Sequence, residues 1–285
     1  MPDWLAAKNN NPNDGPDPIG PKIMGIVNVT PDSFSDGGQF HRSENAISHG
    51  LSLVDQGADL LDIGGESTRP GADPVDEAEE LSRVLPVIEG LSQKTETPIS
   101  IDTRKPLVAQ RAIEAGASIW NDVTALSYAP NSIDMAASLN CSVILMHASA
   151  DPKVMQNNPQ YENVVEDIAA YLQDRVEAAI GGGLQRQNIM VDPGIGFGKS
   201  LTHNLLLLAN LDRFSTIAPV LLGASRKRFI AAIDRDEGGP TRLGGSIAAV
   251  LAGAEANVAC VRVHDVAETR QALAVFANIR RVRSP

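Results

Sequence analysis

The side chains that could perform chemistry follow short apolar runs, at the point where each run stops. Eight such runs are present, and seven of them end in a residue that can bind a ligand or titrate. These residues are Asn28, Asp102, Asn121, His147, Asp192, Ser225 with Lys227, and Arg262 with His264, while the remaining run ends in Gly64-Gly65. Burying so many polar groups without partners would be costly, so we expect them to form a ligand site.

These groups, together with one further cation, fall into two sets by charge. The first set consists of Asp102, Asn121, Asp192 and Lys227. It suits a flat heterocycle with an amino-amidine edge and a carbonyl, because a carboxylate accepts two parallel N–H bonds and a lysine donates to a ring oxygen or nitrogen. The second set consists of Arg69, Arg262 and His264. Its cationic character suits a phosphate or pyrophosphate group.

A third feature is the polar loop that follows the apolar run at 22–29. The amide of Asn28 interrupts this run near its end, and the loop contains Asp36 and is closed by Gly37-Gly38. Asn28 and Asp36 offer oxygen ligands to Mg²⁺, which usually takes one or two protein ligands plus phosphate oxygens and water. A heterocycle, a pyrophosphate and Mg²⁺ together suggest ionisation of a carbon–pyrophosphate bond. The alternative is an ordinary turn in which Asn28 caps its own backbone.

The elements that must position these groups repeat one pattern, in which an apolar run is followed by a loop and an amphipathic helix. One helix is predicted to start after an N-cap at Ser43, and another to begin near Pro106 and stop at Gly116. Eight such units favour a single (β/α)₈ TIM barrel of the α/β class over a doubly wound sheet, with the active site at the C-terminal ends of the strands. We expect one domain over 21–285 and a flexible tail over 1–20.

The amino-acid composition indicates which classes of binding partner the protein can have. The formal charge of -11 argues against nucleic acid and against an anionic membrane surface. Cys141 and Cys260 lie inside apolar runs and are expected to be buried free thiols of a reducing compartment. No apolar segment has the length of a membrane span. Residues 1–20 show no basic region followed by an apolar stretch, so we do not expect export. We therefore expect a cytoplasmic enzyme of small-molecule substrates.

The glycine-rich segment at 194–200 resembles a phosphate-binding P-loop but fails on spacing. A P-loop requires a glycine five residues before Gly198, where this chain has Pro193. The glycines do not match the dinucleotide-binding spacing either. The segment is therefore not expected to bind a nucleotide.

Taken together, the motifs resemble the dihydropteroate synthase family of pterin-binding barrels. The matching segments are 28–38 (NVTPDSFSDGG), 64–71 (GGESTRPG), 101–103 (IDT) with Lys105-Pro106, 121–123 (NDV), 145–147 (LMH), 192–194 (DPG) with 196–199 (GFGK), 225–227 (SRK) and 262–265 (RVHD). They occur in the order of the family and span the barrel from 22 to about 270. The loop after His147, which reads Ala148 to Pro152, departs from the pattern and affects only local contacts.

The resemblance implies a role for each matching residue. The pterin would be held by Thr68, Asp102, Asn121, Asp192 and Lys227. The pyrophosphate would be bound by Arg69, Arg262 and His264, and the metal by Asn28. The 4-aminobenzoate pocket, where sulfonamides compete in this family, would be formed by Phe34, Pro70, Phe197 and Ser225 with Lys227. The catalytic residues would be Asp36, Asp102, Arg69 and Lys227.

The reaction implied is the Mg²⁺-dependent condensation of 6-hydroxymethyl-7,8-dihydropterin pyrophosphate with 4-aminobenzoate by a dissociative route. It needs no protein nucleophile, in keeping with the lack of a Ser-His or Cys-His signature. The family also implies a homodimer. Two rival functions are a methyltetrahydrofolate-dependent methyltransferase, which needs no pyrophosphate site, and a non-catalytic pterin-binding paralogue. His147 is expected to be either a direct ligand or a structural histidine.

Overall fold

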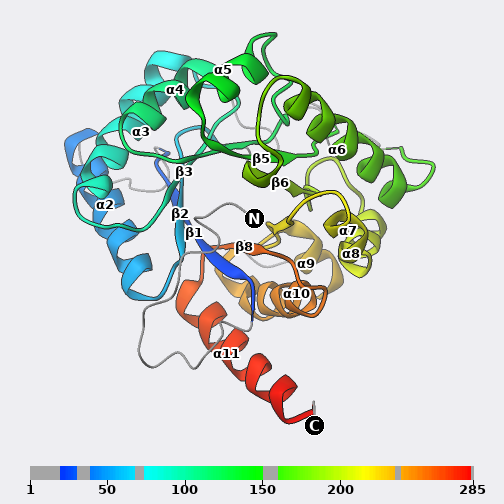
Figure 1. The fold of residues 1–285 in the computed structure, drawn as a ribbon. Helices are drawn as coiled ribbons and strands as arrows, with labels where there is room; N and C mark the ends of the chain where they lie inside the picture. The colour runs from blue at the N-terminus through cyan, green and yellow to red at the C-terminus, as the bar shows by residue number, and fades with distance from the viewer. Residues whose placement is uncertain (1–19, 31–38, 68–73, 150–159, 235–238, 284–285) are drawn as a thin grey trace.

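Eight parallel strands form a barrel that is surrounded by helices (Figure 1). The computed structural model describes residues 20–30, 39–67, 74–149, 160–234 and 239–283. The strands are β1 (Lys22–Asn28), β2 (Leu60–Gly64), β3 (Ile99–Asp102), β4 (Ile119–Asp122), β5 (Ser142–Met146), β6 (Ile189–Asp192), β7 (Leu221–Leu222) and β8 (Cys260–Val263). Their order is β6-β5-β4-β3-β2-β1-β8-β7, and a parallel bridge between Val191 and Val220 joins the two ends of the sheet. The predicted TIM barrel is confirmed.

The helices form the outer layer. They are α2 (Gln39–Asp55), α3 (Glu77–Ser92), α4 (Pro106–Glu114), α5 (Ser132–Leu139), α6 (Val164–Gly181), α7 (Leu201–Ala209), α8 (Leu211–Ser215), α9 (Arg228–Ile233), α10 (Leu243–Glu255) and α11 (Val266–Arg283), with short 3₁₀ turns η1 (Arg186–Asn188) and η2 (Gly239–Arg242). The start of α4 at Pro106 and its end before Gly116 are as predicted. The predicted N-cap at Ser43 is wrong, because α2 already begins at Gln39. An N-cap is worth only about 1 kcal/mol, so packing of the helix can extend it past such a residue.

The strands alternate their side chains between two cores. One face of the strands packs under the helices, and the other fills the barrel. Inside the barrel, one apolar layer consists of Met24, Leu60, Ile119, Ile144, Met190, Leu221 and Cys260. Each large side chain of this layer contributes about 1.5–3 kcal/mol by leaving water. Two residues further along, the same inward face carries Asp62 on β2, Asn121 on β4 and Arg262 on β8. The apolar layer is therefore the floor beneath the polar strand ends.

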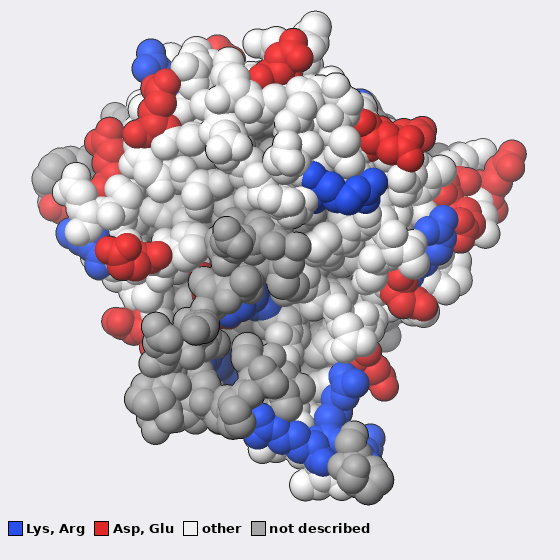
Figure 2. All heavy atoms as spheres, viewed as in Figure 1, with Lys and Arg blue, Asp and Glu red and all other residues white. Residues whose placement is uncertain are grey.

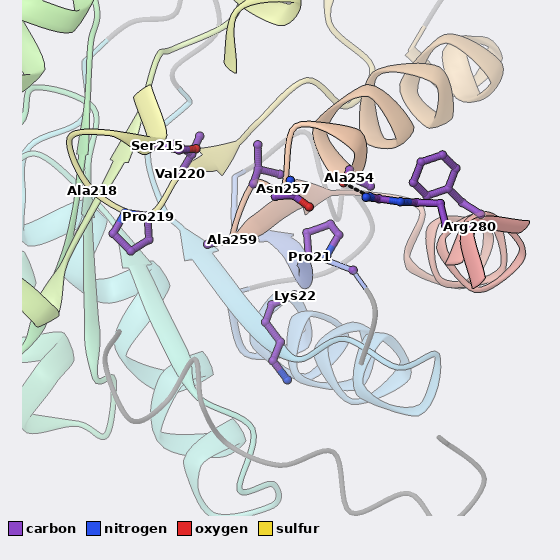
Figure 3. A pocket seen from close by; sticks show the side chains of 13 residues that line it. Pro21, Lys22, Ser215, Ala218, Pro219, Val220, Ala254, Asn257, Ala259 and Arg280 are labelled. Atoms are coloured by element: carbon purple, nitrogen blue, oxygen red, sulfur yellow. Dashed lines mark hydrogen bonds between the residues drawn. The ribbon is translucent and has the colours of Figure 1, made fainter. Parts of the chain in front are cut away.

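A cavity of about 590 Å³ lies at the opposite end of the barrel, where β1 and β8 begin (Figure 3). Its lining includes Pro21, Lys22, Ala259 and Arg280. The Lys22 ammonium is paired with Asp59 at 3.2 Å, and the Arg280 guanidinium donates to the carbonyl of Ala254 at 3.4 Å. Barrel enzymes place their chemistry at the C-terminal strand ends, so this cavity is separate from the predicted site.

Charged side chains of both signs lie on the surface. On the face shown in Figure 2, acidic side chains are spread along the rim, and basic side chains gather where α11 ends with Arg280, Arg281 and Arg283. None of the helices in the described ranges is long and apolar enough to cross a membrane.

Cys141 and Cys260 are buried free thiols, as predicted, and burial raises the pKa of Cys141 to about 11. These thiols are therefore poor nucleophiles.

Candidate active site

The structure brings the described candidate residues to one end of the barrel. Asn28, Asp102, Asn121, Asp192 and Arg262 lie at or near the C-terminal ends of β1, β3, β4, β6 and β8. Ser225 and Lys227 follow β7, Phe197 follows β6, and His264 follows β8. Five further candidates, Phe34, Asp36, Thr68, Arg69 and Pro70, lie outside the described residues. The strand ends thus converge as the alternating pattern predicted.

Arg262 joins two carboxylates across the barrel. Its Nε donates to Oδ2 of Asp62 at 2.5 Å, and its Nη2 donates to Oδ2 of Asp102 at 2.8 Å. Burial acts to lower the pKa of Arg262, but the carboxylates of Asp62 and Asp102 outweigh it and raise the pKa. The guanidinium is therefore always charged, and two ion pairs already orient it.

The Asp102 carboxyl group has a pKa near neutral pH. Burial raises its pKa to about 7, with Arg262 opposing the shift and the nearby Asp62 adding to it. One oxygen accepts from Arg262, and the other has no hydrogen-bond donor among the residues that the structure describes. Gly64 lies beside it, where an added Cβ would come within 3.7 Å of Asp102 and 3.8 Å of Asn28 Oδ1. The glycine therefore keeps open the space between these two side chains.

Lys227 and Asp192 form the opposite side of the site. The Lys227 ammonium lies 4.0 Å from the ring centroid of Phe197, a cation–π contact, and burial lowers the pKa of this lysine to about 8 against the attraction of Asp192. Oδ1 of Asp192 accepts from the backbone N–H of Gly194 at 2.6 Å. Burial raises the pKa of Asp192, while this N–H and Lys227 oppose the shift. Lys227 has no hydrogen-bond acceptor within the described part of the chain, so its donors are available to a ligand.

The unused atoms of these side chains define what can bind. Asp102 Oδ1, Asn121 Oδ1 and Asp192 Oδ2 are acceptors for which the described residues supply no donor. Lys227 adds a cationic donor on the same site. Such an arrangement complements a flat ligand that carries several N–H groups and one acceptor. The sequence predicts a heterocycle with these features.

A polar pair links the ends of β7 and β8. Ser225 Oγ lies 3.0 Å from Nδ1 of His264 and accepts the backbone N–H of the same histidine at 3.2 Å. The hydroxyl can donate its proton to Nδ1 or accept one from it, depending on the tautomer of the ring. In the tautomer that is protonated at Nε2, the imidazole can donate to an anion.

The contacts of His147 within the described residues are structural ones. Burial, followed by the charge of Lys199, lowers the pKa of His147 to about 3, and the ring packs edge-on against Tyr171 with 4.9 Å between ring centroids. Lys199 Nζ lies 3.1 Å from its Nδ1 and donates to the carbonyl of Phe197 at 2.9 Å. Gly194, at φ +68°, passes so close that a Cβ would lie 2.0 Å from the His147 carbonyl oxygen. The histidine therefore supports the turn that follows Asp192.

Sequence reasoning missed two charged residues that matter here, Asp62 and Lys199. Asp62 is fully buried within the apolar run of β2, and Lys199 is only 4% exposed. The strand-end criterion passed over both. The usable signal for Asp62 was its period-2 relation to Leu60 and Gly64, which places a carboxylate inside the barrel.

A second buried ionic cluster holds the connection between β2 and α3. Lys105 Nζ donates to Glu66 at 2.7 Å and to Glu80 at 2.5 Å, and Glu66 also accepts from Arg104 at 3.2 Å. Glu66 Oε1 further accepts the backbone N–H of Val75 at 3.3 Å. The carboxylate of Glu66, before segment 68–73, thus binds Val75 after it.

The predicted magnesium site rests on one described ligand. Asn28 ends β1 with its amide oxygen near Gly64, on the side of the anionic strand ends. Within the described ranges, no three His, Cys, Asp or Glu side chains are grouped so as to hold a metal ion. A single amide oxygen fits Mg²⁺ when phosphate oxygens and water complete the coordination.

Comparison with known proteins points to one family. The sequence profile described as "Pterin binding enzyme" matches residues 24–264. The dihydropteroate synthase of Haemophilus influenzae is 44% identical over 257 residues, covering 90% of this chain and 93% of that protein. That of Escherichia coli is 42% identical over 256 residues, covering 90% of both.

Comparison with solved structures points to the same family as the sequence comparison. A Xanthomonas albilineans dihydropteroate synthase with 4-aminobenzoic acid superposes with a TM-score of 0.87 at 48% identity, covering 92% of this chain and 93% of that one. A structure of that organism's dihydropteroate synthase in complex with 7,8-dihydropteroate has a TM-score of 0.84 at 45% identity, covering 93% and 95%.

Proposed function

The chain belongs to the dihydropteroate synthase family of pterin-binding enzymes and is a transferase of folate biosynthesis, and we propose that it joins its two substrates by a Mg²⁺-dependent, dissociative route. The substrates are 6-hydroxymethyl-7,8-dihydropterin pyrophosphate and 4-aminobenzoate. The products are 7,8-dihydropteroate and pyrophosphate.

The observation that carries the proposal is the set of unused hydrogen-bonding atoms. A dihydropterin presents an amino group and ring N–H groups along one edge and a carbonyl beside them. The three acceptor oxygens on Asp102, Asn121 and Asp192 can receive this edge, and Lys227 can donate to the carbonyl. The related Xanthomonas protein in complex with 7,8-dihydropteroate supports this use of the site.

The other end of the substrate would meet the cations. We assign the pyrophosphate to Arg262 and His264, with Arg69 from the segment outside the described residues. The contact with Ser225 supports this assignment, because a hydroxyl that donates to Nδ1 of His264 leaves the ring proton on Nε2, where it can be donated to an anion. Phe197 and Ser225, with Phe34 and Pro70, would form the 4-aminobenzoate pocket. The Xanthomonas structure with 4-aminobenzoic acid supports a pocket for this acid.

In the proposed mechanism, the bond between the pterin methylene carbon and the pyrophosphate oxygen breaks first. The electron pair leaves with the pyrophosphate, and the methylene carbon becomes cationic. The carboxylate of Asp102, with Asp36, stabilises that charge, and the aniline nitrogen of 4-aminobenzoate then forms the new C–N bond and releases a proton. Arg262 and His264 stabilise the departing anion. Mg²⁺, held by Asn28 and phosphate oxygens, would neutralise charge on the leaving group.

Pyrophosphate release provides the test. We expect the purified protein to sustain pyrophosphate release from the dihydropterin pyrophosphate in step with dihydropteroate formation when 4-aminobenzoate is present, and to stop in EDTA until Mg²⁺ is restored. Activity that is unaffected by EDTA would contradict the magnesium proposal. A folded protein that binds the pterin but releases no pyrophosphate would instead be the non-catalytic paralogue.

We also propose that the enzyme is a cytoplasmic homodimer. Support for the dimer comes from α11, where Val275, Ile279 and Val282 are 56%, 44% and 85% exposed and lie on one helical face by their spacing. Light scattering after size exclusion should give twice the chain mass, and Val275→Asp with Ile279→Asp should give the monomer. Leu107→Asp, at a 39% exposed leucine on α4, is the matched control. A monomeric wild type would contradict the proposal.

A further inference from the structure

Asp62 is a carboxylate placed inside the barrel rather than at its mouth. It lies in the middle of β2, between the inward-facing positions of Leu60 and Gly64, and none of its surface is exposed. In the strand register it is aligned with Ile26 on β1 and Ser100 on β3. A carboxylate in such surroundings is costly to bury unless its oxygens are hydrogen-bonded.

The partners of Asp62 come from two other strands and both belong to the proposed site. Its Oδ2 accepts Nε of Arg262 at 2.5 Å. The amide nitrogen of Asn121 lies 3.3 Å from Oδ2 and 3.4 Å from Oδ1. One side chain of β2 therefore holds a residue of β4 and a residue of β8 in place.

The contact with Asn121 has a chemical consequence. An asparagine amide can present either its N–H₂ group or its oxygen to a ligand, and only its surroundings decide which. An ionised carboxylate accepts hydrogen bonds and cannot donate. Asp62 therefore retains the amide nitrogen of Asn121, and the carbonyl oxygen is left to face the site.

The contact with Arg262 acts in the same direction. With Nε bound to Asp62, the guanidinium is turned so that Nη2 reaches Asp102 at 2.8 Å. That bond occupies Oδ2 of Asp102 and leaves Oδ1 as an acceptor. Two acceptors of the site are thus oriented through one buried carboxylate that lies beneath them.

We propose that Asp62 is a positioning residue that determines specificity, because it fixes Asn121 and Arg262 so that the site accepts only ligands with an N–H-rich edge. This inference rests on the proposed function, since it assigns that edge to the pterin. Asp62 itself does not contact the substrate. The mechanism does not require its oxygens to react.

The test compares binding of two ligands, without turnover. Isothermal titration should show that the wild type binds 7,8-dihydropterin far more tightly than 7,8-dihydrolumazine, in which a carbonyl replaces the amino group. Asp62→Asn can donate as well as accept, so Asn121 can turn its N–H₂ group toward the ligand. We expect the preference for the amino ligand to fall roughly 10- to 100-fold, because discrimination of this kind depends on correctly paired polar groups.

A matched control separates this effect from loss of stability. Asp59 precedes the same strand at the opposite end of the barrel, where it binds Lys22 at 3.2 Å and the backbone N–H of Ile23 at 2.9 Å. Asp59→Asn should leave the preference unchanged. Should Asp62→Asn not fold, Asp62→Ser removes the charge without adding volume and has the same expected result.

The outcomes are distinguishable. A folded Asp62 variant that keeps the wild-type preference would overturn the inference. A reduced preference in the Asp59 control would overturn it too, because loss of a carboxylate outside the site would then suffice. If the wild type binds neither ligand, the proposed function fails, and the inference that rests on it fails with it.

Discussion

Replacing Arg262 with alanine should lower the free energy of unfolding by about 3–5 kcal/mol and lower kcat about 10²- to 10³-fold. The guanidinium compensates Asp62 and Asp102 at 2.5 Å and 2.8 Å. Its loss leaves two like charges in the barrel without the ion-pair partner that they share. It also removes a donor that would stabilise the departing pyrophosphate.

The pH dependence of this loss has a defined sign. Burial already raises the pKa of Asp102, and Arg262 is the group that most opposes the rise. In the variant the pKa of Asp102 should be higher still. A raised pKa in the folded state favours the protonated form, so stability is retained at acid pH and lost as the pH rises through that value. Urea unfolding should therefore show a larger deficit at pH 8 than at pH 5.5.

Two further variants test the cause. Arg213 forms ion pairs with Glu166 on the surface at 38% and 55% exposure, and Arg213→Ala should leave stability nearly unchanged. Arg262→Met combined with Asp62→Leu replaces one buried ion pair with apolar groups and should regain part of the stability but none of the activity. An Arg262→Ala protein with wild-type stability would contradict the account of the buried charges.

The strand ends could be predicted because the barrel imposes the geometry. Parallel strands that alternate with helices must place their C-terminal ends on one face, so Asp102, Asn121 and Asp192 are brought together by topology alone. The ends of individual strands were predicted less accurately. Arg262 was expected to mark the end of the last apolar run, but β8 runs from Cys260 to Val263 and includes it. The arginine is therefore part of the barrel wall and faces inward.

The pairing inside the barrel could not be predicted. Arg262 and Asp62 are separated by 200 positions, and their contact depends on the stagger between strands. The same holds for Lys199, whose ammonium reaches His147 across 52 positions. The raised pKa of Asp102 follows from burial among these groups. Periodicity gives the face of each strand, whereas only the three-dimensional register shows which charges meet.

The pKa values of Asp102 and Lys227 predict a narrow pH profile. Burial raises the pKa of Asp102 to about 7 and lowers that of Lys227 to about 8. Asp102 must be ionised to accept N–H groups, and Lys227 must be protonated to donate. We therefore expect kcat/KM for the pterin substrate to rise through about pH 7 and fall above about pH 8, because this quantity reports the free enzyme.

Asp102→Asn should lower kcat/KM about 10²- to 10³-fold and remove the rising limb of that profile. The amide has the shape of the carboxylate, but it lacks the charge that stabilises the cationic methylene. The free energy of unfolding of this variant should not fall with its activity. The raised pKa shows that the fold disfavours the ionised form, so at pH 8 the variant should unfold at the same or a higher urea concentration than the wild type.

An Asp102→Asn protein that loses activity but keeps its fold would show that the charge is retained for the reaction, at some expense of stability. Wild-type kcat/KM in this variant, or loss of its fold at pH 8, would contradict that assignment.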